Sequence, residues 1–279
     1  MQKALIWLFG WVPLRLMYAF TAVAIPGYML NAKTRKASYD FFRLRMGYGP
    51  VKSALHVFSN MYNMGKVIMD RFAVYAGRPF GMLSQDLKVY YHPAMHEGPI
   101  VMLSSHVGNY EMCGYMLPSP RATKVLVYAG ETATIMQNRA RVFGDALVEM
   151  VPVSEDLSHL FTLNAALAEG EIVSLPADRI FGSSKAVTVP FFGAPARFPS
   201  GPFLMAVQRN VPVLVPFVMK EDVKLYRVIV RRLDVPTEGT RQEKVQALCA
   251  AYAQALESVV RQYPDQWYNF YDFWSGDAL

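Results

Sequence analysis

Charged side chains are scarce in this sequence, and cysteine is almost absent. Lys, Arg, Asp and Glu make up only 18% of the 279 residues, whereas 53% are hydrophobic and the mean hydropathy is +0.15. Two cysteines, Cys113 and Cys249, are too few for a disulfide framework, which fits a protein of a reducing compartment. The 16 methionines and 13% aromatic residues indicate adaptable apolar surfaces in addition to a core.

Several motifs that would assign a function are also missing. The chain has no Gly-x-Ser-x-Gly elbow of a serine hydrolase, and no His-Glu-x-x-His or Cys/His zinc spacing. It has no basic run interleaved with aromatic residues, which argues against nucleic acid as a partner. We therefore expect neither a metal ion nor a cofactor.

Acidic residues are especially rare in the first part of the chain. Residues 1–80 carry eleven Lys or Arg but only two Asp or Glu, whereas the remainder carries seventeen against twenty. A basic, apolar segment on a nearly neutral body predicts contact with an anionic membrane surface.

Residues 4–30 are largely apolar, although Pro13, Arg15 and Pro26 interrupt them. A spanning helix needs about 20 apolar residues, and a signal peptide needs a small-residue cleavage site. No such site is found, and the basic residues 33–36 follow directly. We interpret the segment as a membrane anchor, either a tilted span or a deep interfacial helix. The alternative is a helix packed on the protein's own core.

After residue 87 the hydrophobic pattern alternates between strands and helices. Strands are predicted at 87–91, 100–103, 124–128, 147–152, 171–175, 187–192, 211–219 and 225–231. Helices are predicted at 38–46, 51–76, 110–117, 132–143, 157–169, 201–209 and 243–262. This order predicts an α/β fold with a mixed, largely parallel sheet flanked by helices. We expect an N-terminal helical, membrane-anchoring region (1–80) and an α/β domain (81–279).

A histidine and a glutamate stand where the predicted strand 100–103 gives way to a helix. His106 follows the strand, Gly108 and Asn109 supply a turn, and Glu111 lies in the first helical turn. Residues five apart diverge within one helix, so His106 and Glu111 can meet only across the turn. A neutral His held by a carboxylate can accept a proton on its other nitrogen. The alternative is a His that only satisfies buried backbone groups.

Further polar residues follow other predicted strands and helices. Asp178 comes directly after the apolar run 172–175 and, in a parallel sheet, would share an edge with His106. Guanidinium groups nearby could bind phosphates or carboxylates. The candidates are Arg139, Arg141, Arg179 and Arg197. For Arg139 and Arg141 an ordinary surface charge is the alternative.

The hexapeptide His106-Val-Gly-Asn-Tyr-Glu111 resembles the His-x4-Asp/Glu motif of the glycerolipid acyltransferase superfamily. Its branch of bacterial lipid A biosynthesis (lauroyl/myristoyl) acyltransferases is the most similar. Further ordered blocks extend the resemblance over residues 95–272. They are Asp178, the block 189–201, the strand 212–216 and the segment 263–268.

The resemblance implies transfer of an acyl group from a thioester of acyl carrier protein or coenzyme A to a membrane lipid. The acceptor would be a hydroxyl of a lipid A precursor or a related lipid, at the cytoplasmic side of a bacterial inner membrane. His106 would be the general base and Glu111 would orient it. Asn109, Asp178 and the four arginines would bind substrate. Alternatives are another acceptor (a lysophospholipid, aminolipid or glycolipid), a thioester hydrolase, or a non-catalytic lipid-binding protein.

Overall fold

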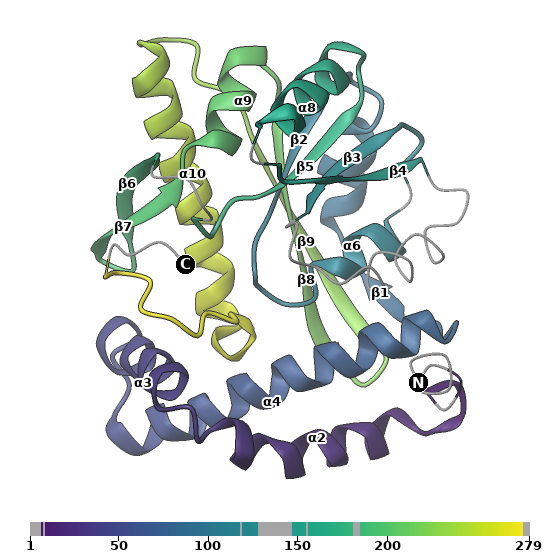
Figure 1. The fold of residues 1–279 in the computed structure, drawn as a ribbon, viewed down its shortest axis with the longest axis vertical. Coiled ribbons are helices and arrows are strands. Elements are labelled where there is room, and N and C mark those ends of the chain that lie inside the picture. The colour runs from purple at the N-terminus through teal and green to yellow at the C-terminus, as the bar shows by residue number, and fades with distance from the viewer. Residues whose placement is uncertain are drawn as a thin grey trace.

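A seven-stranded sheet forms the centre of the protein, in the order β1-β9-β8-β2-β5-β3-β4 (Figure 1). The computed structural model describes residues 7, 9–117, 119–127, 147–154, 156–180 and 185–275. The strands are β1 (Gly81–Leu83), β2 (Ile100–Ser104), β3 (Thr123–Val127), β4 (Val148–Pro152), β5 (Ile172–Pro176), β8 (Val213–Asp222) and β9 (Leu225–Leu233). Only β9 pairs antiparallel with its neighbour β8, and all other pairs are parallel. The predicted mixed, largely parallel sheet is confirmed.

The central strand β2 is buried on both faces, which explains its uninterrupted apolar sequence. Val101 and Leu103 join the large core cluster on one face, whereas Ile100 joins a second cluster on the other. All three side chains are fully buried. Successive residues of a strand point to opposite faces, so a buried strand needs apolar residues at every position.

Helices cover both faces of this sheet. On one face lie α8 (Ser158–Ala168), α9 (Gly201–Arg209) and α10 (Arg241–Gln262), most of whose buried apolar residues belong to the large cluster. The other face is covered by α6 (Glu111–Met116) and by the helical stretch formed by η2 (Leu87–Tyr91) and α5 (His92–Ala94). A capping box between Thr240 and Glu243 starts α10.

A two-stranded hairpin of β6 (Ala186–Phe191) and β7 (Ala194–Pro199) stands apart from the main sheet. Its two-residue loop, Phe192 and Gly193, has positive φ angles of 49° and 74°. Positive φ at both loop residues matches the right-handed twist of the flanking strands, as in type I′ turns.

The described residues before the sheet include the helices α2 (Leu14–Tyr28), α3 (Ala32–Asp40), which continues into a π-helical turn (Phe41–Arg45), and α4 (Pro50–Tyr75). Figure 1 shows α2 lying along α4, and α4 crossing one end of the β8–β9 pair. A glycine permits this close approach, because a Cβ at Gly65 would lie 2.0 Å from Cγ2 of Thr21. Ile25, Phe42 and Met61 belong to the large core cluster, so these helices share a core with the sheet.

One prediction of secondary structure was wrong. Leu87–Tyr91 is helical rather than extended, and its buried residues Leu87 and Tyr91, four apart, share one face of the helical turn. The block 189–201 runs into helix α9 as predicted, but it also contains β7, for which no strand was predicted. The predicted helix 132–143 lies outside the described residues.

Among the described helices, none combines the length and the hydropathy needed to cross a bilayer. The predicted membrane association of residues 1–80, and their separation from 81–279 as a domain, stay predictions.

Candidate active site

The turn after β2 is held in place by two distant parts of the chain. The backbone N–H of Gly108 donates to the carbonyl of Gln266 at 2.7 Å, and that of Asn109 donates to the carbonyl of Val218 at 2.7 Å. The N–H of Tyr268 in turn donates to the carbonyl of His106 at 2.9 Å. Residues 106–109, which we call the catalytic turn after the base predicted at His106, therefore lie between β8 and the C-terminal segment.

Glycine is required at position 108. Its φ is +61°, and a Cβ there would lie 2.2 Å from the carbonyl oxygen of Val218. A side chain would both strain the backbone and separate the turn from β8.

The carboxylate that meets His106 is that of Asp178. Nδ1 of His106 lies 2.9 Å from one Asp178 oxygen, and the His106 backbone N–H donates to the other at 2.7 Å. The Asp178 side chain is 2% exposed, whereas the imidazole is 23% exposed. The carboxylate thus lies behind the ring, and the ring lies nearer to solvent.

Strand register explains this meeting. β2 and β5 are parallel neighbours in which Ser104 pairs with Pro176. His106 and Asp178 each stand two residues beyond that pair, so they leave the same edge of the sheet together. The sequence contained this signal, since both follow apolar strands, although there Asp178 was expected to bind substrate.

Asp178 is held in its charged form. Burial alone would raise the pKa of its carboxyl, but the charge of His106, the hydrogen bonds from that residue and the charge of Arg179 bring the pKa below its ordinary value. A carboxylate on Nδ1 fixes the proton there, which leaves Nε2 as the basic nitrogen.

Glu111 pairs with a residue of the N-terminal region. Its Oε1 lies 3.0 Å from Nη2 of Arg71 on α4, and the glutamate side chain is almost fully buried. This ion pair joins the first turn of α6 to α4. The predicted role of Glu111 in orienting His106 stays a prediction, and Asp178 provides the observed contact with Nδ1.

The other predicted binding residues are dispersed. Asn109 is buried, and its side-chain N–H donates to the hydroxyl of Tyr226 at 3.1 Å. Arg179 donates to the carbonyl of Tyr268 at 2.8 Å, beside the catalytic turn. Arg197 lies on β7 of the separate hairpin. Arg139 and Arg141 lie outside the described residues. Substrate binding by these residues stays a prediction.

Two other chemistries lack support at this site. Burial raises the pKa of the Cys113 thiol to about 12, which disfavours the thiolate that a nucleophile needs. Within the described part of the chain, no three His, Cys, Asp or Glu side chains are grouped closely enough to hold a metal ion.

Comparison with known proteins agrees with the geometry. Residues 85–275 match the family described as bacterial lipid A biosynthesis acyltransferase, and this stretch covers more than half of the chain. It includes the catalytic turn, Asp178 and the C-terminal segment. A search of curated proteins finds no match.

Proposed function

Because the chain belongs to the family of bacterial lipid A biosynthesis acyltransferases, we propose that it moves a fatty acyl group from a thioester to a hydroxyl of a lipid A precursor or a related membrane lipid. The donor would be acyl carrier protein or coenzyme A. The observation that carries the proposal is the contact between Nδ1 of His106 and the buried carboxylate of Asp178. It leaves a basic nitrogen on a partly exposed ring.

His106 acts as general base in this reaction. Nε2 takes the proton of the acceptor hydroxyl while its oxygen attacks the thioester carbonyl. The tetrahedral intermediate collapses, the carbon–sulfur bond breaks, and the thiolate receives the proton from the imidazolium. Asp178 keeps the ring oriented and stabilises its positive charge during these steps.

Two neighbouring residues support the dyad. Arg179 follows Asp178 directly and supplies a positive charge that suits phosphate groups of the donor or acceptor. Glu111 fixes α6 to α4 through Arg71 and so holds the chain that leaves the catalytic turn. Substitution of Glu111 by glutamine decides whether Glu111 also acts on His106.

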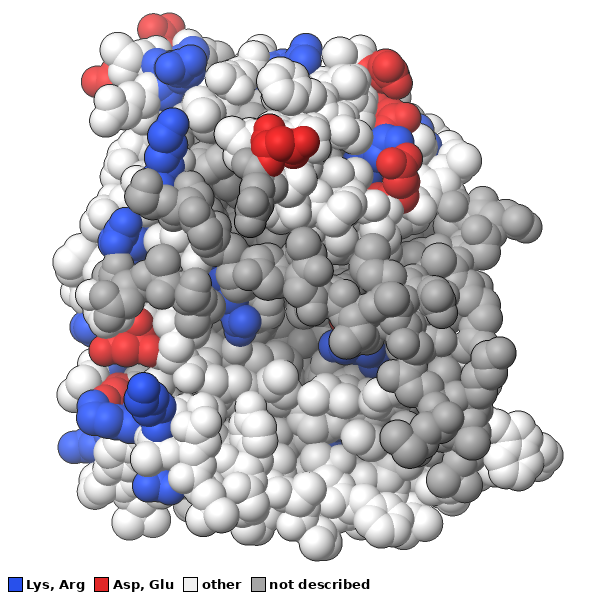
Figure 2. Space-filling model, viewed as in Figure 1, with Lys and Arg blue, Asp and Glu red and all other residues white. Residues whose placement is uncertain are grey.

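The N-terminal helices provide the surface for the membrane. Large hydrophobic side chains are exposed along them, and Figure 2 shows that the lower edge of the molecule, over α2 and α4, is uncharged across most of its width. The exposed residues include Trp11, Leu16, Phe20, Val23 and Leu30. An apolar face beside basic residues suits a helix that lies in the interface of an anionic bilayer. We propose the cytoplasmic face of the bacterial inner membrane.

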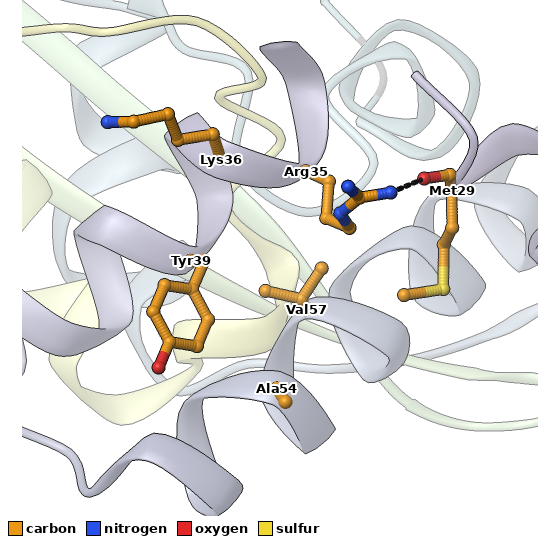
Figure 3. A pocket seen from close by; sticks show the side chains of 6 residues that line it. All are labelled: Met29, Arg35, Lys36, Tyr39, Ala54 and Val57. Carbon is orange, nitrogen blue, oxygen red and sulfur yellow. Dashed lines mark hydrogen bonds between the residues drawn. The ribbon is translucent and has the colours of Figure 1, made fainter. Parts of the chain in front are cut away.

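A small cavity lies beside this apolar face. It has a volume of about 210 Å³ and lies between α3 and α4 (Figure 3). Arg35 and Lys36 line it together with apolar side chains such as Met29 and Val57. The Arg35 guanidinium donates to the carbonyl of Met29 and the Lys36 ammonium pairs with Asp40, so a lipid phosphate at this cavity would share these cations with their protein partners.

The membrane proposal is tested with two exposed phenylalanines. Phe20→Asp on α2 should weaken binding to phosphatidylglycerol vesicles by about 10-fold or more, because an apolar ring is lost from the interface. Phe161→Asp on α8 is the matched control and should leave binding unchanged. Equal effects of the two substitutions would refute the assignment of the surface.

The catalytic proposal is tested with His106→Ala. Lipid mass spectrometry of cells that express the wild-type protein should show a lipid heavier by one acyl group, and His106→Ala should abolish it. His96→Ala, an exposed histidine, is the control. Near-normal acylation by a folded His106→Ala variant would contradict the proposal. Thioester cleavage that needs no lipid would instead favour a hydrolase.

A further inference from the structure

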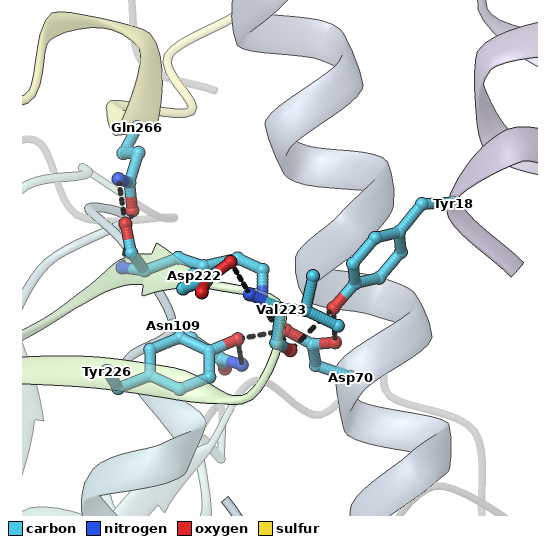
Figure 4. Close-up of polar contacts among 8 residues, drawn as sticks. Tyr18, Asp70, Asn109, Asp222, Val223, Tyr226 and Gln266 are labelled. Atoms are coloured by element: carbon cyan, nitrogen blue, oxygen red, sulfur yellow. Dashed lines mark hydrogen bonds and ion pairs between the residues drawn. The ribbon is translucent and has the colours of Figure 1, made fainter. Parts of the chain in front are cut away.

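Behind the catalytic turn lies an enclosed cluster of polar side chains, which Figure 4 shows between α2, α4 and the β8–β9 pair. We call it the Asp70 cluster. Its members are Tyr18 of α2, Asp70 of α4, Lys220 of β8, Tyr226 of β9 and Asn109 of the catalytic turn. All five residues are buried.

Asp70 is the centre of the cluster. Nζ of Lys220 lies 2.6 Å from one carboxylate oxygen, and the hydroxyls of Tyr18 and Tyr226 both donate to the carboxylate. The ammonium group also donates to the carbonyl of Val223 at 3.2 Å. Burial of a charged carboxylate without these donors would cost free energy. Because all the donors bind the same carboxylate, a shift of one donor changes the hydrogen bonds of the others.

Two chains of hydrogen bonds lead from the cluster to the catalytic turn. In the first, the Tyr226 hydroxyl accepts from the side chain of Asn109 at 3.1 Å. In the second, the side chain of Gln266 bonds both the N–H and the carbonyl of Lys220 at 2.8 Å. The Gln266 carbonyl then accepts from the N–H of Gly108. Positions 108 and 109, two and three residues after His106, are thus both fixed by groups that touch the cluster.

The cluster also reaches the opposite way, to the exposed helix α2. Tyr18 points from α2 across to Asp70 on α4 (Figure 4). On the same helix Leu16, Phe20 and Val23 are exposed. One face of α2 therefore carries the apolar surface assigned above to the membrane, while the other supplies a donor to Asp70.

We propose that the Asp70 cluster couples the seating of α2 on a lipid surface to the geometry of the catalytic turn. Tyr18, Asp70 and Tyr226 are then positioning residues for His106. When α2 leaves its place, Asp70 loses one donor and its remaining donors rearrange, which shifts Tyr226 and the Asn109 side chain bonded to it. The coupling rests on the proposed acyl transfer and adds a means by which a membrane would accelerate it.

The test compares two hydroxyl deletions, Tyr18→Phe and Tyr226→Phe, with Tyr91→Phe. Tyr91 is a buried tyrosine whose hydroxyl donates to the Leu117 carbonyl at 3.4 Å, outside the cluster. Transfer from lauroyl coenzyme A to a lipid A precursor is measured with the precursor in phosphatidylglycerol vesicles and in a non-ionic detergent. Thermal unfolding is recorded for each variant.

Tyr226→Phe should lower kcat about 10-fold both in vesicles and in detergent, with little change in KM, because misplacement of the base affects the reaction step. Tyr18→Phe should instead lower the ratio of the vesicle rate to the detergent rate at least about 3-fold. Tyr91→Phe should change neither quantity. A purely structural role would lower the unfolding temperature without changing the ratio.

Wild-type kinetics in both Tyr18→Phe and Tyr226→Phe, while His106→Ala is inactive, would overturn the coupling and leave the proposed function intact. Activity in His106→Ala would instead overturn the proposed function. If Tyr226→Phe does not fold, Tyr18→Phe alone tests the coupling. An unchanged ratio of the vesicle rate to the detergent rate in Tyr18→Phe would then refute it.

Discussion

Two aspartates near the catalytic turn, Asp178 and Asp70, are almost completely buried, but their carboxylates bind different kinds of groups. Their side chains are 2% and 0% exposed. Asp178 holds a histidine that is itself partly exposed, whereas Asp70 holds an ammonium group and two hydroxyls that are all buried. Behind His106 the carboxylate therefore faces the group that is proposed to take a proton from the substrate. Asp70 faces only the protein.

The pKa values of the two carboxyls also differ. The pKa of Asp178 is below its ordinary value because His106 and Arg179 outweigh burial. The pKa of Asp70 is above its ordinary value because burial outweighs Lys220 and the two hydroxyls. A buried carboxylate is thus suited to catalysis when charged donors compensate its burial and the partner reaches solvent. A carboxylate that is enclosed on all sides, such as that of Asp70, instead fixes the positions of the neighbouring helices and strands.

Substitution of Asp178 should have the largest effect on catalysis. In Asp178→Asn the amide no longer holds the proton on Nδ1, so kcat should fall on the order of 10³- to 10⁴-fold. Steady-state acyl transfer measures the loss, and Asp234→Asn, an exposed aspartate, is the control. If Asp178→Asn retains more than about one tenth of the activity, Asp178 does not orient the base.

Substitution of Asp70 should have its main effect on folding. Asp70→Ala leaves the Lys220 ammonium buried without its carboxylate, and the free energy of unfolding should fall by about 3–5 kcal/mol. Urea unfolding measures the change. The double variant Asp70→Leu with Lys220→Met removes both charges and should recover most of the loss. A loss below about 1 kcal/mol in Asp70→Ala would show that the pair contributes little.

The two aspartates should also respond oppositely to acid. A carboxyl with a lowered folded pKa, as in Asp178, adds stability above its unfolded pKa of about 3.9, and this stability is lost as the pH falls through the folded pKa. With its raised folded pKa, Asp70 costs stability above that pKa, and the cost disappears as the pH falls towards 3.9.

Urea unfolding of the wild type, Asp178→Asn and Asp70→Asn between neutral pH and about pH 2 separates the two pH dependences, because the Asp178 contribution is lost below the unfolded pKa of about 3.9 and the Asp70 cost disappears above it. The deficit of Asp178→Asn relative to the wild type should be largest at neutral pH and should shrink towards the acid end. Equal slopes in the wild type and both variants would contradict the assigned pKa directions.

The smallest effect is expected from Glu111→Gln. Its amide can still accept a hydrogen bond from Arg71, so the link from α6 to α4 is weakened rather than removed. We expect kcat to fall about 10-fold at most. A loss as large as that of Asp178→Asn would make Glu111 the residue that orients His106.

Much of the sheet could be predicted from the sequence because its central strands are mostly apolar runs. β2 and β5 are recognisable in this way. The ends of α9 are also marked in the sequence, because Pro202 lies in its first turn and Asn210, in the left-handed conformation, follows its last residue. Short segments were harder, since the spacing of Leu87 and Tyr91 fits a helix turn as well as a strand.

The site was predictable only in part. His106 could be identified from its place after β2, but its partner depends on which strand lies beside β2, and that is a property of the assembled sheet. The Asp70 cluster could not be found from sequence, because Asp70 and Lys220 are 150 positions apart and no local pattern links them.

The central claim is that Asp178 acts through His106. A double-mutant cycle of His106→Ala and Asp178→Asn, with single-turnover acyl transfer as the measured rate, tests it directly. If the claim is right, Asp178→Asn costs about 10³-fold or more in the wild-type background but almost nothing in the His106→Ala background. Equal losses in both backgrounds would contradict it, because Asp178 would then contribute without the histidine.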